Sequence, residues 1–206
     1  MESNWAAEHL QVIRTLMERS ALYRRALAPI MLYVGTLGVL AGAGGIVCHF
    51  ETLRAFCGWW LATAVVAVIG AFLIARRQAL KDKESFWSPP TRRVAQALLP
   101  PLAAGLFLSV MLVVLDAEHM QWLFIFLNVF FYGCALHAAG FFMPRGMKLF
   151  GWLIILLAGA TLLVTPILQT DPCPVLDHAL MGFFFGVLHL AYGVYLYLTE
   201  KGKTPA

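Results

Sequence analysis

Residues 121–142 read QWLFIFLNVFFYGCALHAAGFF and contain no aspartate, glutamate, lysine or arginine. A helix of about 20 apolar residues crosses a hydrocarbon core of roughly 30 Å, so this stretch has the length and composition of a transmembrane helix. Transmembrane β-strands are about half as long and alternate in polarity, which this stretch does not. Five further segments share its character, and they are residues 27–47, 56–75, 97–115, 149–168 and 178–198. The sequence therefore predicts an all-α integral membrane protein with six transmembrane helices.

The composition of the whole chain indicates the same class. The chain has 206 residues, of which 61% are hydrophobic and 13% are charged, whereas soluble domains carry about 25% charged residues. The formal net charge of +4 does not indicate nucleic-acid binding, because the basic residues are confined to segments between the apolar runs. The expected partner is the lipid bilayer, and no nucleic-acid partner is expected.

The basic residues also predict how the chain is oriented. Of the 15 lysines and arginines, only Arg54 lies in a loop on the opposite side of the predicted membrane. The others are Arg14, Arg19, Arg24, Arg25, Arg76, Arg77, Lys81, Lys83, Arg92, Arg93, Arg145, Lys148, Lys201 and Lys203. Cytoplasmic loops are enriched in lysine and arginine. We therefore expect a multi-pass protein of the cell inner (plasma) membrane with both termini in the cytoplasm.

Residues 1–25 precede the first apolar run and have the pattern of an amphipathic helix. Val12, Ile13, Leu16 and Met17 fall near one side of such a helix, with basic residues away from it, as expected for a helix lying on the inner leaflet. The alternative is a stub that extends the first transmembrane helix into the cytoplasm. No cleavable signal peptide is evident, so the first apolar run is expected to act as a signal anchor. The predicted organisation is a cytoplasmic helix over residues 1–25 and a six-helix bundle with a short tail over residues 26–206.

Glycines and aromatic residues predict which faces pack and where helices end. Gly38 and Gly42 in the first run form a small-xxx-small pair, as do Gly182 and Gly186 in the sixth. Such faces let helix backbones approach closely in lipid, so we expect helices one, four and six at the centre. Amphipathic rings favour the membrane interface, and interface anchors at the outer ends are predicted at Trp59, Trp60 and Trp122. Pro100 and Pro101 are expected near a helix start, where a missing amide costs little.

Two histidines within the predicted spans are the main functional candidates. His137 and His189 lie in the inner halves of the fourth and sixth helices, each between glycines, with Cys134 and Tyr192 nearby. An ionisable residue inside a membrane is a functional-site hypothesis by default. One hypothesis is a b-type haem held by both imidazoles. Others are a buried metal ion, a protonatable pair that gates a pore, or neutral histidines hydrogen-bonded to Tyr132, Tyr192 or a backbone carbonyl.

Asn128 is the other strongly polar residue deep in a span. It lies nine positions before His137 and hence on the opposite face of the same helix, so it is expected to bond to a different neighbour. No aspartate, glutamate, lysine or arginine lies in a predicted span core. That pattern argues against a carrier driven by protons or sodium through a buried carboxylate, but not against a passive pore.

The outer loops contain weaker candidates for a metal site. His49, His119 and His178 lie there among several carboxylates, and zinc, copper or manganese takes such ligands. Their spacings match no ligand motif, and short outer loops become acidic simply because lysine and arginine stay inside. Cys48, Cys57 and Cys173 also lie at outer ends, where one structural disulfide and free thiols are both compatible with the sequence.

Three segments resemble those of uncharacterised bacterial six-helix inner-membrane proteins. They are residues 11–20 (QVIRTLMERS), 137–146 (HAAGFFMPRG) and 188–195 (LHLAYGVY). The resemblance covers most of the chain and implies a bacterial inner membrane, but no activity.

No Walker, His-Glu-x-x-His or Gly-x-Ser-x-Gly motif occurs in the chain, so the sequence indicates no enzyme class. The leading expectation is a non-enzymatic module that binds or senses through its buried histidines or through partners. The alternative is a small channel or transporter assembled as a homo-oligomer. A third reading is a haem-dependent electron carrier.

Overall fold

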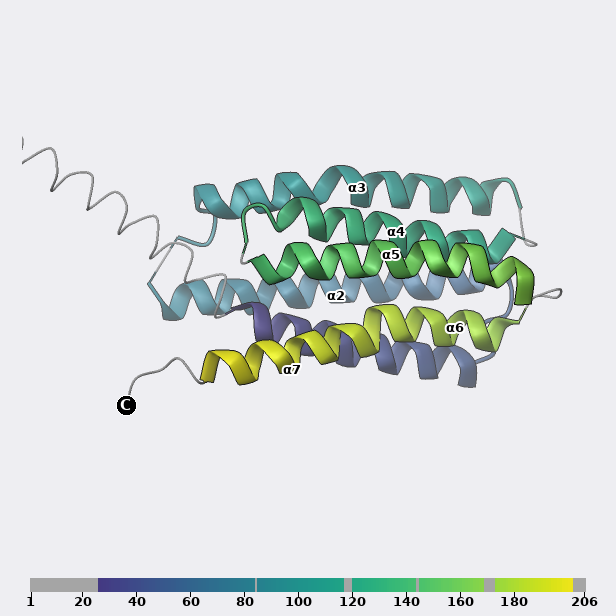
Figure 1. Cartoon of the computed structure of the whole chain (residues 1–206), viewed down its shortest axis with the longest axis horizontal. Coiled ribbons are helices and arrows are strands. Elements are labelled where there is room, and N and C mark those ends of the chain that lie inside the picture. The colour runs from purple at the N-terminus through teal and green to yellow at the C-terminus, as the bar shows by residue number, and fades with distance from the viewer. Residues whose placement is uncertain (1–25, 84, 117–119, 144, 169–172, 202–206) are drawn as a thin grey trace, which may run out of the picture.

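The structure, a computed structural model, describes residues 26–83, 85–116, 120–143, 145–168 and 173–201. These residues form helices and short turns with no strand among them, and six helices are long and apolar enough to cross a membrane. Helices that follow one another in the chain run in opposite directions, so the start of the first helix, at Ala26, and the end of α7, at Lys201, lie at the same end of the bundle (Figure 1). The predicted amphipathic helix over residues 1–25 lies outside the described residues.

The six helices follow the predicted order along the chain. The first helix covers Ala26–Val47, and it is followed by α2 (Leu53–Lys81), α3 (Pro89–Val114), α4 (Gln121–Ala139) and α5 (Arg145–Leu168). The sixth span, Pro174–Thr199, is built from α6 (Pro174–Gly182), a π-helical turn η2 (Phe183–Val187) and α7 (Leu188–Lys201).

Helices α2 and α3 extend well beyond the apolar segments that predicted them. The continuation of α2 contains arginine, glutamine, alanine, leucine and lysine, all of which are good helix formers. Helix α3 begins after the N-cap Ser88, with prolines at its first positions, where proline is favoured. Hydropathy reports where the apolar surface ends, and these two helices continue into the basic loop.

This early start corrects the prediction for Pro100 and Pro101, which lie inside α3 rather than near its beginning. Each proline lacks the amide hydrogen that a helix interior uses. Transmembrane helices tolerate proline more readily than soluble ones do, because neighbouring groups can satisfy the freed carbonyls.

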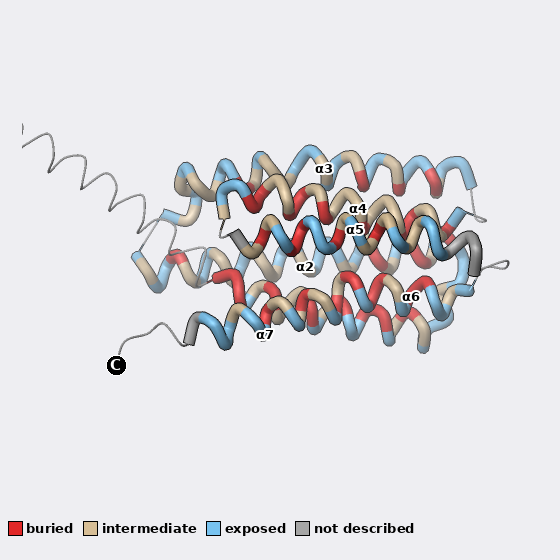
Figure 2. Tube along the Cα trace, viewed as in Figure 1, coloured by how far each residue is buried: buried red, intermediate tan, exposed pale blue. Residues whose placement is uncertain are grey.

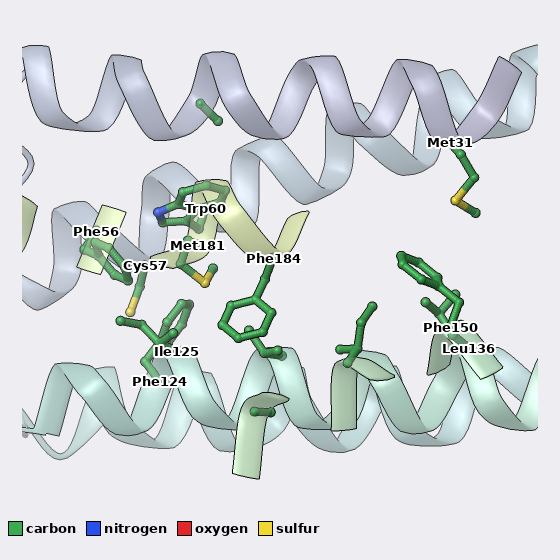
Figure 3. Packing of buried hydrophobic residues seen from close by; sticks show 14 of the residues in the cluster. Met31, Phe56, Cys57, Trp60, Phe124, Ile125, Leu136, Phe150, Met181 and Phe184 are labelled. Carbon is green, nitrogen blue, oxygen red and sulfur yellow. The ribbon is translucent and has the colours of Figure 1, made fainter. Parts of the chain in front are cut away.

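The core lies between the first helix, α4, α5, the sixth span and the N-terminal part of α2 (Figure 2). Figure 3 shows Phe56, Cys57 and Trp60 of α2 gathered with residues of α4 and α6 towards one side. On the other side, Phe150 and Leu136 lie together, and Met31 lies nearby. Helix α3 packs on α4 and buries little else. Trp60 is only 4% exposed, so it is a core residue and not the interface anchor that its position at a helix end predicted.

The first helix and the sixth span approach each other through glycines. A methyl group added at Gly38 would overlap the backbone of Phe185, and one at Gly42 would lie 3.0 Å from the Gly182 Cα atom. A methyl group at Gly186 would lie 2.6 Å from the Val39 amide nitrogen. Any larger side chain at these positions would therefore push the two helices apart.

Glycines also line the contact between α4 and α5. An added methyl group at Gly133 would lie 2.9 Å from the Ile155 side chain, and one at Gly151 would lie 2.5 Å from the His137 backbone nitrogen. The glycines beside His137 and His189 thus bring helices together, whereas the haem hypothesis expects them to make room for a ring.

Candidate functional site

A cavity of about 80 Å³ lies where α2 separates from the core. Its wall includes residues of four of the six spans, and they are Val34, Leu37, Gly38, Trp60, Leu61, Thr63, Ala64, Ala67, Phe124, Asn128, Met181 and Phe185. One water molecule needs only about 10–15 Å³ by a comparable measure, so the space is larger than an ordinary packing defect. The cavity is partly open, and Ala64 in its wall is exposed at the molecular surface.

The packing of α2 explains why the cavity forms there. The buried residues of α2 are concentrated at its N-terminal end, from Leu53 to Trp60, and Ala79 is the only one nearer its C-terminal end. Two hydrogen bonds attach α2 to the first helix, one at Trp59 and one at Val66. Trp59 Nε1 donates to the Ala41 carbonyl at 2.9 Å, and the Tyr33 hydroxyl donates to the Val66 carbonyl at 2.9 Å. The cavity occupies the stretch between these two attachments.

Asn128 is the strongest hydrogen-bonding group in the cavity wall. Its Nδ2 donates to the Ser109 hydroxyl at 2.8 Å and to the Phe124 carbonyl at 2.9 Å. Its Oδ1 accepts no hydrogen bond from another described residue. The Thr63 hydroxyl donates to the Trp59 carbonyl at 2.9 Å. The wall therefore offers one unused amide oxygen in an otherwise apolar surface. These contacts also confirm that Asn128 and His137 bond to different neighbours.

His178 lies directly behind the cavity wall, against Trp60 of α2. Its side chain is buried, and its Nδ1 accepts a hydrogen bond from Trp60 Nε1 at 3.1 Å. Its Nε2 lies 3.1 Å from the Phe50 carbonyl, which can only accept. These two partners require the neutral imidazole with its proton on Nε2. The histidine predicted as an outer-loop metal ligand is thus a buried link between α2, the sixth span and the loop after the first helix.

His189 lies behind another part of the wall and is fully buried, with 0% exposure. Its Nδ1 is 2.9 Å from the Phe184 carbonyl, and its Nε2 is 2.8 Å from the Tyr132 hydroxyl. The carbonyl accepts from Nδ1, so in the neutral ring Nε2 accepts from tyrosine. This is the arrangement that the sequence offered as the hydrogen-bonded alternative.

The hydrogen bond to Phe184 also accounts for the π-helical turn. In the turn, the Leu188 amide donates to the Phe183 carbonyl, five residues earlier, instead of to a carbonyl four residues earlier. The Phe184 carbonyl is therefore available to the His189 ring. Turns of this kind occur frequently at functional sites.

Two wall residues connect the cavity to the two histidines. Trp60 stacks on His178 with ring centroids 6.2 Å apart, and Phe185 stacks on His189 at 6.3 Å. Trp60 and Phe185 also contact each other, with ring centroids 6.4 Å apart. A molecule in the cavity would contact both Trp60 and Phe185. Trp60 stacks on His178, and Phe185 stacks on His189.

His137 is separate from this arrangement. It is half-buried, its Nδ1 lies 3.4 Å from the Lys148 carbonyl, and its ring packs edge-on against Phe141 and Trp152. Among the described residues, no hydrogen bond or ring contact joins His137 to His189. Haem ligation by both would require His189 Nε2 to release Tyr132, so the observed geometry favours hydrogen-bonded histidines.

The residues predicted near these histidines are placed as follows. Tyr192 stacks on Phe150 at 4.5 Å, and Phe150 in turn packs edge-on against His189. The Tyr192 hydroxyl is buried without a hydrogen-bond partner among the described residues. Cys134 is half-buried on α4.

The other outer-face candidates do not assemble with His178. His49 is exposed and lies 3.4 Å from the Glu51 carboxylate, and His119 lies outside the described residues. The described part of the chain contains no group of three or more histidine, cysteine, aspartate or glutamate side chains placed to hold a metal ion. All four cysteines are free thiols, with Cys57 buried and Cys48 and Cys173 exposed.

A second buried polar pair, at the starts of α4 and α6, was not expected from the sequence. Gln121 Nε2 donates to Asp177 Oδ2 at 2.8 Å, and Asp177 is only 3% exposed. Asp177 directly precedes the predicted apolar run of residues 178–198, so the sequence predicted it in a solvated loop. The available signal was the proline at position 174, a favoured first helical residue, which starts α6 early enough to bury Asp177.

Comparisons of this chain with protein-family models, with curated proteins and with solved structures found no match.

Proposed function

We propose that this chain is a multi-pass membrane protein whose cavity binds a neutral, largely hydrocarbon molecule with one hydrogen-bond donor. The observation that carries the proposal is the cavity wall, which is apolar except for the Asn128 amide and hydroxyl or indole groups already in use. Ligand sites are typically concave and mostly apolar, with a few polar groups that orient the ligand.

The chemistry of the wall restricts the ligand class. No charged side chain lines the cavity, and an unpaired charge inside a membrane is costly. A charged ligand group would therefore have no counter-ion there. The Asn128 Oδ1 atom can accept a hydrogen bond, so a hydroxyl or amide N–H is the matching polar group. A long-chain alcohol has this combination of groups, and a cavity of about 80 Å³ would hold only its hydroxyl end, with the rest of the chain outside the cavity.

Binding is favoured over catalysis because the wall lacks a reactive pair. General acid–base catalysis requires a titratable group within hydrogen-bond reach of the substrate. His178 and His189 are each separated from the cavity by an aromatic residue, and both ring nitrogens of each are hydrogen-bonded. We therefore propose a non-enzymatic role.

The same arrangement supports a sensing role. An occupant that displaces the Trp60 ring would disturb its hydrogen bond to His178, and one that displaces Phe185 would disturb the stack on His189. A ligand shifts a conformational equilibrium only through such differential contacts. In this proposal, a ligand in the cavity changes the contacts of His178 and His189 and so changes the conformation of the sixth span.

The proposal places both termini in the cytoplasm of a bacterial cell. It is supported by the exposed basic residues of the α2–α3 hairpin, which lie at the same end of the bundle as Ala26 and Lys201. It is also supported by the close glycine contacts between the first helix and the sixth span, since small-xxx-small faces are typical of helix association in lipid.

Extraction of the purified protein with organic solvent, followed by mass spectrometry, tests the proposed binding. The wild type should carry a neutral, largely hydrocarbon molecule in stoichiometric amount. Ala67→Phe fills the cavity from α2 and should deplete that molecule. Ala62→Phe adds the same ring to the same helix at an exposed position outside the wall, so it should retain it.

Two results would overturn the proposal. One is equal recovery of the molecule from both variants, which would place its binding elsewhere on the protein. The other is a charged molecule in the wild type that is lost only in Ala67→Phe, because the wall offers no counter-ion.

A further inference from the structure

The end of the bundle that holds Ala26 also carries a concentrated positive surface, which the proposed function does not use. Six basic side chains lie on the adjoining ends of α2 and α3 and in the turn after α2, and all six are exposed. They are Arg76, Arg77, Lys81, Lys83, Arg92 and Arg93, and we name this surface the basic hairpin end.

Among the described residues, the basic hairpin end carries an excess of positive charge. None of the six residues forms an ion pair within the described part of the chain. Asp82 is the one described carboxylate between positions 76 and 93, and it accepts a hydrogen bond from Gln78 Nε2 at 3.0 Å. By contrast, Arg54 at the other end of the bundle pairs with Asp116 at 3.0 Å. The hairpin therefore presents a surplus of unpaired cations.

Exposed apolar side chains accompany these cations. Leu80 is 69% exposed and Trp87 is 52% exposed. The Trp87 ring packs against Phe86, and Phe86 packs edge-on against Phe72 of α2 with centroids 4.7 Å apart. A tryptophan with an apolar body and a polar N–H favours the boundary between lipid and water. The surface thus combines cations with groups that favour a membrane interface.

The position of the cations along α2 matches the depth of lipid headgroups. Arg76 directly follows the apolar run of residues 56–75, and Lys81 lies about 7–8 Å further along the axis, since a helix rises about 1.5 Å per residue. Long basic side chains at helix ends can bend towards the interface. The basic side chains at this end of α2 therefore lie at the depth of the phosphate groups of one lipid leaflet.

We propose that the basic hairpin end binds anionic phospholipid headgroups. Four of its six cations are arginines, whose guanidinium groups match phosphate in a bidentate geometry. Clusters of four to eight basic residues directly beyond a transmembrane helix are typical of such recognition. A lipid is favoured over a nucleic acid because the surface continues two apolar spans and includes exposed Leu80 and Trp87.

The test is quenching of Trp87 fluorescence by brominated lipids in vesicles that contain the full-length protein. The Trp87 contribution is the difference between the protein and its Trp87→Phe variant. In low salt, brominated phosphatidylglycerol should quench it at least about fivefold more efficiently per mole than brominated phosphatidylcholine. The preference should fall at high salt, because exposed charges are screened over about 10 Å at 0.1 M ionic strength.

Two matched variants separate charge from structure. R76Q/R77Q/R92Q/R93Q should lose the preference, and R76K/R77K/R92K/R93K should keep most of it. Arg54→Gln, at the opposite end, should leave it unchanged. Equal quenching by both lipids in the wild type would overturn the proposal, as would a preference that survives in the glutamine variant or at high salt. Binding of an oligonucleotide in place of the lipid would likewise contradict it.

Discussion

At the scale of single residues, the two buried histidines satisfy both of their ring nitrogens in different ways. His178 accepts from a tryptophan on α2 and lies against the Phe50 carbonyl, whereas His189 lies between Tyr132 and a carbonyl of its own helix. Buried polar groups that keep all their partners stabilise one packing arrangement, while a lost partner leaves a desolvated atom.

Tyr132→Phe should destabilise the protein, because it leaves His189 Nε2 buried without a partner. The expected loss is about 1 kcal/mol, since hydrogen bonds between membrane helices average somewhat less than that and an orphaned polar atom adds to it. Reversible unfolding in mixed detergent micelles measures the free energy of unfolding. Tyr195→Phe removes a hydroxyl from an exposed tyrosine and should have almost no effect. Equal losses in both variants would contradict the role assigned to Tyr132.

The hydrogen bonds of His189 also bear on the haem hypothesis. The absorption spectrum of protein expressed with ample haem should lack a Soret band, because Tyr132 occupies the His189 Nε2 atom in this packing. A Soret band that shifts on reduction and disappears in His137→Ala and in His189→Ala would show instead that these helices rearrange around a haem.

Residue-scale contacts were the part of the site that the sequence could not predict. The sequence correctly offered Tyr132 or a backbone carbonyl as a histidine partner, because these groups lie within reach along or beside a predicted helix. It gave no indication of the Trp60–His178 pair, since these residues are 118 positions apart. Trp60 was predicted as an interface anchor and His178 as a metal-ligand candidate of the outer loops, and the packing of α2 on the sixth span buries both.

At the scale of helices, the sequence predicted the existence and order of all six apolar spans, because a run of about 20 apolar residues is a strong signal. It missed the extensions of α2 and α3, since helix-forming polar residues give no hydropathy signal. The π-helical turn was also missed. It leaves the Phe184 carbonyl available to the His189 side chain, and no period in the sequence marks it.

Glycines on packed and open faces should respond in opposite ways to a methyl group. Gly38→Ala should destabilise the protein by about 1–3 kcal/mol, because the methyl group overlaps the backbone of Phe185 and the helices must separate. Gly58 on α2 and Gly159 on α5 have no neighbouring atom within 4 Å of an added methyl group. Gly58→Ala and Gly159→Ala should be neutral or stabilising by up to about 1 kcal/mol, because alanine is the better helix former.

These glycine variants can be compared in the same unfolding experiment as the tyrosine variants. A Gly38→Ala protein as stable as Gly58→Ala would show that the first helix does not pack closely on the sixth span.

At the scale of the whole molecule, the arrangement of cysteines provides a test of orientation. Cys48 and Cys173 are exposed near the end of the bundle opposite Ala26, whereas Cys57 is only 2% exposed. A membrane-impermeant maleimide should therefore modify single-cysteine variants at positions 48 and 173 in intact spheroplasts, and Cys57 only after unfolding. Modification of Cys48 and Cys173 only after lysis would reverse the proposed orientation.

The cavity results both from residue contacts and from the packing of whole helices. It forms where α2 separates from a core of packed aromatic residues and glycines. Of the spans, α2 has the smallest share of buried residues in its apolar window, at 11%, and two hydrogen bonds to the first helix keep it in place across the cavity. The sequence identified Asn128 as an unusual polar residue but could not place it beside a cavity, because that requires the relative positions of four spans.

The most direct test of the central claim is photo-crosslinking of the reconstituted protein with a long-chain alcohol that carries a diazirine. If the cavity binds a neutral amphiphile, peptide mass spectrometry should find adducts on wall residues such as Trp60, Asn128 and Met181. These adducts should disappear in Ala67→Phe and persist in Ala62→Phe. Adducts confined to lipid-facing residues such as Val65 and Val68, with the same pattern in both variants, would contradict the account.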